Sequence, residues 1–174
     1  MGEIHPFLPE KLIMGILVSR SEHLSRMEKL LTDEFGPVDY RSELFPFTFT
    51  GYYDREMGEG IRRRFLSFRR LVDPASIAEI KLRTNQLEEH FLEKGNRKIN
   101  LDPGLLSLGK LILASTKDNA QRIPLSRGIY GEITLMYRKK AYHPLPWTYP
   151  DYQSEKYHEI LLHIRDIYTG QLQA

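Results

Sequence analysis

Cysteine is absent from all 174 residues of the chain. Its absence excludes disulfide bonds, zinc sites built from thiolates and cysteine nucleophiles, and it fits the reducing conditions of a cytoplasm. An excess of charge of one sign is also missing, because 25 lysines and arginines face 23 aspartates and glutamates, for a net charge of +2. Such a small net charge argues against a chain that coats nucleic acid in general.

A long hydrophobic run is missing as well. The longest one, Leu12 to Val18, is far shorter than the roughly 20 residues that a membrane-spanning helix needs. The first residues, MGEIHPFLPEK, lack the basic segment followed by an apolar run that marks a secretory signal. We therefore expect a soluble, cytoplasmic protein without a membrane partner. The sequence indicates no oligomeric state.

The composition is that of an ordinary globular protein, with 41% hydrophobic and 28% charged residues. A chain of this length suits one compact domain. No internal repeat, low-complexity tract or linker divides it, so we expect a single domain over residues 1–174.

The first half of the sequence alternates between strand and helix patterns. Stretches rich in apolar or aromatic residues predict three strands, at residues 12–18, 38–50 and 64–72. Apolar residues at three- and four-residue spacing predict two helices, which end at Gly36 and Gly95. Because Pro46 cannot donate a ladder hydrogen bond, the second strand should lie at an edge or bend.

The second half predicts strands at residues 108–115, 122–125 and 129–138 and a last helix from about Gln153 to Tyr168. The strand at 108–115 would complete the split βαβ pattern of a ferredoxin-like sandwich. We therefore predict an α+β fold, an antiparallel sheet with helices packed on it. Its ferredoxin-like βαββαβ core would be extended by a C-terminal β-hairpin and a final helix.

One segment, GLLSLGKL at residues 104–111, resembles a phosphate-binding loop. Its two glycines and its lysine have the required spacing, but Leu111 stands where the loop needs a hydroxyl group for magnesium. The residues after Lys110 predict a strand rather than the helix whose N-terminus faces the phosphates. STKDN, at residues 115–119, carries its carboxylate one residue away from its place in a guanine-binding motif. We therefore do not expect a GTPase, and Asp102-Pro103-Gly104 favours a turn.

Six motifs spread over the chain carry a resemblance: GYYDREMGEG (51–60), KLRTNQLE (81–88), NLDPG (100–104), ASTKDNAQRIPL (114–125), GIYGEITLMY (128–137) and LPWTYPDY (145–152). Together they resemble a family of bacterial and archaeal proteins of about this length that is catalogued as a domain of unknown function. The resemblance covers nearly the whole chain and implies no activity, substrate or cofactor. Some members carry a GTP-binding label, which the altered phosphate loop does not support. Gln121 stands where the family has a histidine, which argues against acid-base chemistry at that position.

Three carboxylates in these motifs are candidates for catalysis or magnesium ligation, namely Glu56, Asp102 and Glu132. Glu56 lies near two tyrosines in a predicted loop. Glu132 lies on a predicted strand, and if helices cover its face, Arg122 on the preceding strand is the expected partner. A strand that faces solvent is the alternative.

Eight further residues are candidates for ligand binding: Tyr52, Lys81, Asn85, Arg97, Lys117, Arg122, Tyr149 and Asp151. Lys81, Asn85 and Glu88 share a polar stripe of the second helix, where Lys81 would bind an anion and Asn85 would orient it. A solvated helix face is the alternative. Tyr149 would line a pocket, whereas Asp151 also suits the cap of the last helix. The lysines and arginines of the set supply positive charge for phosphate groups.

Two functions from different classes are consistent with these patterns. The first is an enzyme that acts on a small anionic substrate, one that carries a phosphate or is a nucleotide, with magnesium as a candidate cofactor. The second is a non-catalytic RNA- or protein-binding module that uses the basic cluster Arg62–Arg70 with Phe65 and Phe68. A charged strand edge is the alternative for this cluster. The six histidines show no metal-binding spacing, so the sequence predicts no metal site of the protein's own.

Overall fold

The computed structural model describes residues 2–173. It is a mixed α/β structure, whose described part contains a large antiparallel sheet and four α-helices. The helices are α1 (Leu24–Phe35), α2 (Asp54–Met57), α3 (Ile77–Glu89) and α4 (Glu155–Gln173), with 3-10 turns η1 (Ser21–His23), η2 (Pro74–Ser76) and η3 (Pro150–Gln153). None of the helices within 2–173 is long and apolar enough to cross a membrane.

The strands are β1 (Glu10–Val18), β2 (Val38–Arg41), β3 (Phe45–Pro46), β4 (Arg62–Val72), β5 (Leu92–Glu93), β6 (Asn96–Arg97), β7 (Ile99–Leu106), β8 (Lys110–Ser115), β9 (Ile123–Ser126), β10 (Ile129–Arg138) and β11 (Ala141–Pro144). Nine of them form one sheet in the order β11-β10-β8-β7-β1-β4-β2, with β3 paired to β4 and β9 paired to β10. The remaining two, β5 and β6, form a small hairpin of their own. The long strands β1 and β4 therefore lie inside the sheet.

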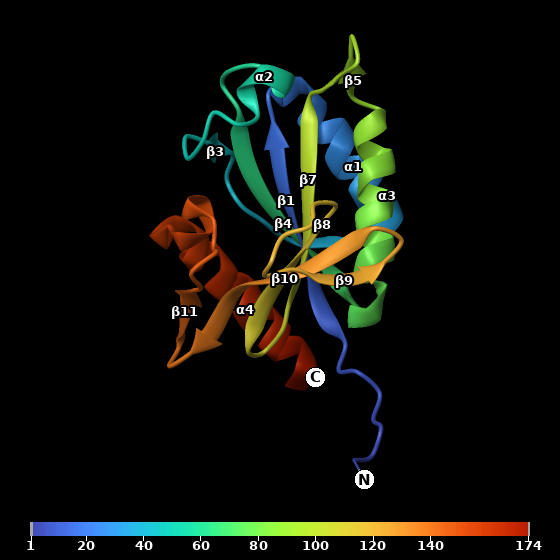
Figure 1. The fold of residues 1–174 in the computed structure, drawn as a ribbon, viewed down its shortest axis with the longest axis vertical. Coiled ribbons are helices and arrows are strands. Elements are labelled where there is room, and N and C mark those ends of the chain that lie inside the picture. Colours follow the sequence, from blue (N-terminus) through green and yellow to red (C-terminus); the bar gives the residue numbers. More distant parts are fainter. Residues whose placement is uncertain (1, 174) are drawn as a thin grey trace.

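Helices cover both faces of this sheet (Figure 1). Side chains point alternately to the two faces of a strand, and both faces of β1 are apolar. On one face Leu12, Met14 and Ile16 join a core with residues of α1 and α3. On the other face Ile13 packs in a second core with Phe65 and the inner side of α4. The strand predicted at residues 12–18 is confirmed as part of β1, and both of its faces are covered.

The turn predicted at Asp102-Pro103-Gly104 is wrong, because these residues lie within β7. The strand pairs with β1 along its whole length, from Lys11 opposite Leu106 to Val18 opposite Ile99. Turn-forming residues are accepted here because the pairing to β1 and the burial of neighbouring leucines outweigh local preference. The strand that comes after α3 and pairs with β1 is thus β7, not the stretch at residues 108–115 that we expected.

The segment that resembles a phosphate loop is a β-hairpin. Residues 104–106 end β7, Lys110 begins β8, and Ser107 closes the turn by donating its N–H to the Lys110 carbonyl at 2.9 Å. Lys110 enters a strand, so its neighbourhood offers no helix N-terminus to a phosphate group. The prediction of a strand after the glycines is confirmed.

The strands β7 and β8 separate soon after the hairpin. Their pairing covers only Gly104–Leu106 against Leu111–Leu113, whereas β8 continues to Ser115 as a partner of β10. Pro103, which has no N–H to donate, stands where the pairing ends. Residues 99–103 of β7 therefore have no strand on that side, and polar side chains line the opening that results.

Gly104 permits the close approach of the two strands at this point. A Cβ atom on Gly104 would lie 2.7 Å from the Leu113 Cδ2 atom and 2.9 Å from the Ile112 carbonyl oxygen. The second of these contacts is with backbone, which cannot move aside as a side chain can. The close approach of β7 and β8 therefore depends on a glycine.

We predict that Gly104→Ala lowers the free energy of unfolding by about 1–3 kcal/mol, the usual cost of overpacking. The thermal midpoint should fall by roughly 2–10 °C for a chain of this size. Gly109→Ala is the matched control, because nothing lies within 4 Å of a Cβ atom there. Equal midpoints for the two variants would contradict a close approach of the strands at Gly104.

Candidate functional site

A cavity of about 570 Å³ lies where β8 leaves β7. Its wall is formed by α3, by the ends of β7 and β8, by the segment that precedes α2 and by η3. It brings together all the candidate residues named from the sequence except Glu56: Tyr52, Lys81, Asn85, Arg97, Asp102, Lys117, Arg122, Glu132, Tyr149 and Asp151. Glu56 does not line the cavity, but it binds Arg97, which does.

The centre of the site is Arg63 of β4, whose exposure is only 2%. Its guanidinium group donates to Asp102 Oδ2 at 2.8 Å, to Asp151 Oδ2 at 3.3 Å and to the Tyr157 hydroxyl at 3.0 Å. These three partners belong to β7, η3 and α4. Gly15 of the neighbouring strand β1 provides the room, because a Cβ atom there would lie 2.7 Å from Arg63 Nη1. One buried side chain thus joins four elements of the fold.

Asp102 and Asp151 share this arginine but differ in acidity. Burial opposes the charged form of Asp102, yet the positive charges of Arg63 and Lys81 outweigh it, so the pKa of Asp102 is lowered. Burial raises the pKa of Asp151, and Arg63 offsets only part of the effect. The longer of the two hydrogen bonds, at 3.3 Å, is the one to Asp151. The geometry therefore favours a charged Asp102 beside an Asp151 that holds its proton more firmly.

The prediction that Asp151 caps the last helix is wrong. Ser154 stands immediately before α4, and its hydroxyl accepts a hydrogen bond from the Tyr157 N–H at 3.4 Å. The cap position is therefore filled by serine. The Asp151 carboxylate instead accepts from Arg63 and from the N–H of Tyr152, which leaves it at the cavity wall.

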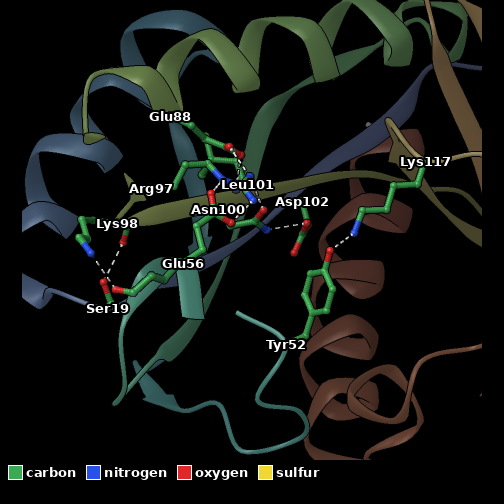
Figure 2. A network of polar contacts seen from close by, with 11 residues as sticks. Ser19, Tyr52, Glu56, Glu88, Arg97, Lys98, Asn100, Leu101, Asp102 and Lys117 are labelled. Carbon is green, nitrogen blue, oxygen red and sulfur yellow. Dashed lines mark hydrogen bonds and ion pairs between the residues drawn. The ribbon is translucent and has the colours of Figure 1, made fainter. Parts of the chain in front are cut away.

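Arg97 organises the part of the wall near α3 (Figure 2). It binds both carboxylate oxygens of Glu56, at 2.7 and 2.9 Å, and it also donates to Glu88 and to Asn100. Asn100 in turn donates to Asp102 Oδ1 at 2.9 Å. Burial raises the pKa of Glu88, although several hydrogen bonds act against the rise. A continuous polar network therefore runs from Glu56 to the Arg63 centre.

Lys81 and Asn85 lie one helical turn apart on α3 and both line the cavity. The solvated-face alternative is wrong for Lys81, which is 7% exposed and donates to the Leu101 carbonyl oxygen at 2.8 Å. Glu88, the third member of the stripe, is 3% exposed and accepts from the Leu101 N–H. This stripe faces β7 and the cavity, and no hydrogen bond from another described residue reaches the Asn85 side chain.

Glu132 and Arg122 form the buried pair that we expected from the sequence. Arg122 Nε lies 2.9 Å from Glu132 Oε2, and both side chains are at most 6% exposed. Gln121 donates to the same carboxylate oxygen at 3.0 Å. Arg122 also reaches Ser115 and, at 3.4 Å, the Tyr149 hydroxyl. A solvent-facing Glu132 is excluded, and the pair secures the loop between β8 and β9 against β10.

The mouth of the cavity is formed by two exposed side chains, Tyr52 and Lys117 (Figure 2). Lys117 Nζ donates to the Tyr52 hydroxyl at 2.6 Å and lies 4.4 Å from the centre of the same ring. Tyr52 comes from the segment before α2, and Lys117 comes from the loop after β8. Two segments that are distant in the sequence therefore meet over the site.

The basic cluster Arg62–Arg70 is not a charged sheet edge, because β4 lies between β1 and β2. Arg63 is buried at the site, and Arg64 binds Glu28 of α1 at 2.7 Å. Arg62, Arg69 and Arg70 are exposed. The cluster is thus divided between the interior and the surface rather than forming one basic face.

Sequence reasoning missed Arg63 and Asn100, which hold the two carboxylates of the site. A signal for Arg63 is present in RRRFLSF, residues 62–68. Three consecutive arginines at the start of a strand must point to both of its faces. In a strand that lies inside a sheet, at least one of them has to be buried and paired. The alternative given for this cluster, a charged strand at the edge of the sheet, does not require any of these arginines to be buried.

Metal ligands are sparse in the site. Among residues 2–173, no group of three or more histidine, cysteine, aspartate or glutamate side chains could hold a metal ion. Asp102 and Asp151 are both occupied by Arg63.

The fold and the cavity define a mixed α/β protein with a charged internal site that is secured by arginine–carboxylate pairs. The chain belongs to the family described as domain of unknown function DUF4416, whose model matches residues 8–168. Membership in an uncharacterised family of this kind, expected from the six motifs, is confirmed. No curated protein and no solved structure matches the chain. Function must therefore be inferred from the geometry of the cavity.

We predict that Asp102→Asn and Asp151→Asn change stability with opposite dependence on pH. The lowered pKa of Asp102 means that folding favours its charged form, a contribution present above about pH 4 and lost as the pH falls through the folded pKa. The raised pKa of Asp151 means that folding favours its neutral form, so its ionisation destabilises the fold as the pH rises above about 4.

The measurement is the thermal midpoint of each variant minus that of the unsubstituted protein, from about pH 3 to pH 7. This difference should fall with rising pH for Asp102→Asn and rise for Asp151→Asn. Asp33→Asn, in an exposed pair with Lys29, is the control for a surface carboxylate. If the two differences changed with pH in the same direction, the pKa values of Asp102 and Asp151 would not be shifted in opposite directions, and the prediction would be wrong.

Proposed function

We propose that this chain is an enzyme that acts on a small anionic molecule, one that carries a phosphate or is a nucleotide, bound in the cavity. The observation that carries the proposal is the position of Lys81. Its buried side chain lines the cavity and has one hydrogen bond to the described residues, to the Leu101 carbonyl. An ammonium group has three donors. Two therefore remain for a ligand, and an anionic acceptor gives the stronger hydrogen bonds.

The size and the charge of the cavity support the same ligand class. Its volume of about 570 Å³ lies within the roughly 300–1,000 Å³ of small-molecule sites. Lys117 adds positive charge to the wall, whereas Arg97 and Arg122 are paired with the carboxylates of Glu56, Glu88 and Glu132. Lys117 is partnered by a neutral phenol, Tyr52, which an anionic ligand would replace with a charge-assisted contact.

Asp102 and Asp151 are the carboxylates that we assign to proton transfer. Both line the cavity, and they are bound to the same guanidinium group. When the environments of two neighbouring acids push their pKa values apart, the acid and base roles are divided between them. Asp102 is then the base, because its pKa is lowered. Asp151 is the proton donor, because its pKa is raised.

Glu56 and Glu132, the other two candidates for catalysis, have positioning roles in this proposal. Glu56 binds Arg97 through both oxygens, and hydrogen bonding from Arg97 lowers its pKa. Glu132 accepts from Arg122 and from Gln121. Each carboxylate holds an arginine at the wall of the cavity.

Magnesium stays a prediction. Mg²⁺ is commonly bound by one or two carboxylates together with phosphate oxygens of the substrate, without a cage of protein ligands. Asp102, whose side chain is partly exposed, would be the first ligand of such an ion. A ligand that binds equally well with and without magnesium would remove the ion from the proposal.

The second candidate function, an RNA- or protein-binding module, receives less support. Its predicted surface was the cluster Arg62–Arg70, and Arg63 and Arg64 of that cluster are engaged in internal ion pairs. Electrostatic binding of a nucleic acid backbone requires cations that face the solvent together. The remaining exposed arginines of β4 are Arg62 at one end and Arg69 and Arg70 near the other.

We also propose that the core is ferredoxin-like. The strand order β7-β1-β4-β2 with antiparallel neighbours supports it, because β1-α1-β2-β4-α3-β7 follows the βαββαβ order along the chain. The strands β8, β10 and β11 then extend the sheet beyond β7. The cytoplasmic location predicted from the sequence remains part of the proposal.

The test is a thermal-shift screen of the purified chain with sugar phosphates, nucleotides and inorganic phosphate, each with and without magnesium. A ligand present at a hundred times its dissociation constant stabilises by about 2.7 kcal/mol. For a chain of this size the midpoint should rise by roughly 5–10 °C. No shift with any phosphate compound would contradict the proposal.

The binding site is then located with Lys81→Met and Asn85→Ala. Both should abolish or reduce the shift, and Asn85→Ala removes no hydrogen bond between described side chains, so the fold should tolerate it. Lys29→Met, on the exposed face of α1, is the matched control and should leave the ligand-induced shift unchanged. A shift that survives both cavity substitutions would place the ligand elsewhere.

A further inference from the structure

Three exposed aromatic rings surround the mouth of the cavity. Phe49, Tyr52 and Tyr149 line it and are 39%, 63% and 53% exposed. Single exposed apolar residues are ordinary on a protein surface, but rings that gather at one opening are a recurrent feature of ligand sites. The hydrogen bonds of Arg63 and Arg97 involve none of these three rings. The two networks therefore do not explain why the rings face the solvent.

The rings are held in place by their surroundings. Phe49 packs against Phe47 and Tyr157 with ring centres 5.9 and 5.8 Å apart. Tyr52 meets Tyr53 edge to face at 5.1 Å. Tyr149 precedes Pro150 and has the extended backbone that a following proline favours. Rings restrained in this way lose little further freedom when they contact a ligand.

The two tyrosines also connect the mouth to the cationic loop after β8. The Tyr52 hydroxyl accepts from Lys117, and the Tyr149 hydroxyl accepts from Arg122. Lys117 and Arg122 come from the same loop, residues 116–122. The apolar ring faces and the positive charges are therefore side by side, with the Lys81 ammonium on the α3 wall of the same cavity.

We infer that the ligand is a nucleotide, with its phosphate bound by Lys81 and the cations of the loop and its base stacked on the rings at the mouth. This inference rests on the proposed function and names the substrate class of the same site. Every nucleobase has a flat face that stacks on aromatic side chains, and one such contact is worth about 1–3 kcal/mol. A sugar phosphate has the anion without that face. Phe49, with no polar atom in its side chain, favours the ligand that carries the base.

The test compares the dissociation constants of ribose 5-phosphate and of adenosine, guanosine, cytidine and uridine 5′-monophosphates by calorimetry. The nucleotide with the highest affinity should bind at least about 10-fold more tightly than ribose 5-phosphate, which corresponds to about 1.4 kcal/mol. Phe49→Ala and Tyr149→Ala should each reduce that advantage about 5-fold or more. Phe49→Ala removes no hydrogen-bond partner of a loop cation, so it should also leave the ribose 5-phosphate constant within about 2-fold. Phe7→Ala, at an exposed ring outside the cavity, is the matched control.

The outcomes separate this inference from the proposed function. Equal affinity for ribose 5-phosphate and all four nucleotides would overturn the inference and leave the phosphate site standing. Loss of nucleotide binding in Asn85→Ala together with an unchanged advantage in the ring variants would also overturn it. No binding of any of these compounds would contradict the proposed function itself. A short RNA that binds far more tightly than the mononucleotides, in a salt-dependent manner, would assign the rings to RNA and overturn the inference.

Discussion

The guanidinium group of Arg63 connects the parts of this molecule that make up its site. A fully buried arginine is unfavourable unless its donors are matched by acceptors, and here Asp102, Asp151 and Tyr157 supply them. Burial raises the pKa of Tyr157 to about 12, so the phenol is a neutral partner, and Asp102, whose pKa is lowered, carries the compensating charge. Because these partners come from β7, η3 and α4, the same contacts that neutralise Arg63 also bring the three elements to the cavity.

The sheet explains why a cavity exists at this place. β8 accompanies β7 for three residues and then continues with β10, so the first half of β7 has an open side. Side chains of α3 and of the segment before α2 line this opening. Two long-range contacts, the Arg122–Glu132 pair and the Lys117–Tyr52 contact, hold the loop after β8 over the opening.

Local patterns in the sequence predicted the long elements: β1 follows from a continuous apolar run, and α1, α3 and β10 follow from the spacing of their apolar residues. The other elements depend on the pairing of strands that are distant in the sequence. Asp102-Pro103-Gly104 has the chemistry of a turn, and only the pairing with β1 keeps it extended. The polar motifs contained the candidate residues that line the cavity, because short polar segments at the ends of elements are where sites form. That these motifs meet in one place is a consequence of the fold. Arg63 could not be selected in that way, since its burial depends on β4 lying inside the sheet, which is a consequence of strand order.

The measurement that tests the central role of Arg63 most directly is a double-mutant cycle between Arg63 and Asp151. The free energy of unfolding would be determined at pH 7 for Arg63→Met, Asp151→Asn, the double variant and the unsubstituted protein. Removing the arginine alone leaves Asp102 and Asp151 without their ion-pair partner and should cost about 3–5 kcal/mol. Removing Asp151 as well should recover part of that loss, with a coupling energy above about 1 kcal/mol, as expected for groups in contact. Additive losses would contradict the claim that Arg63 holds the carboxylates of the site together.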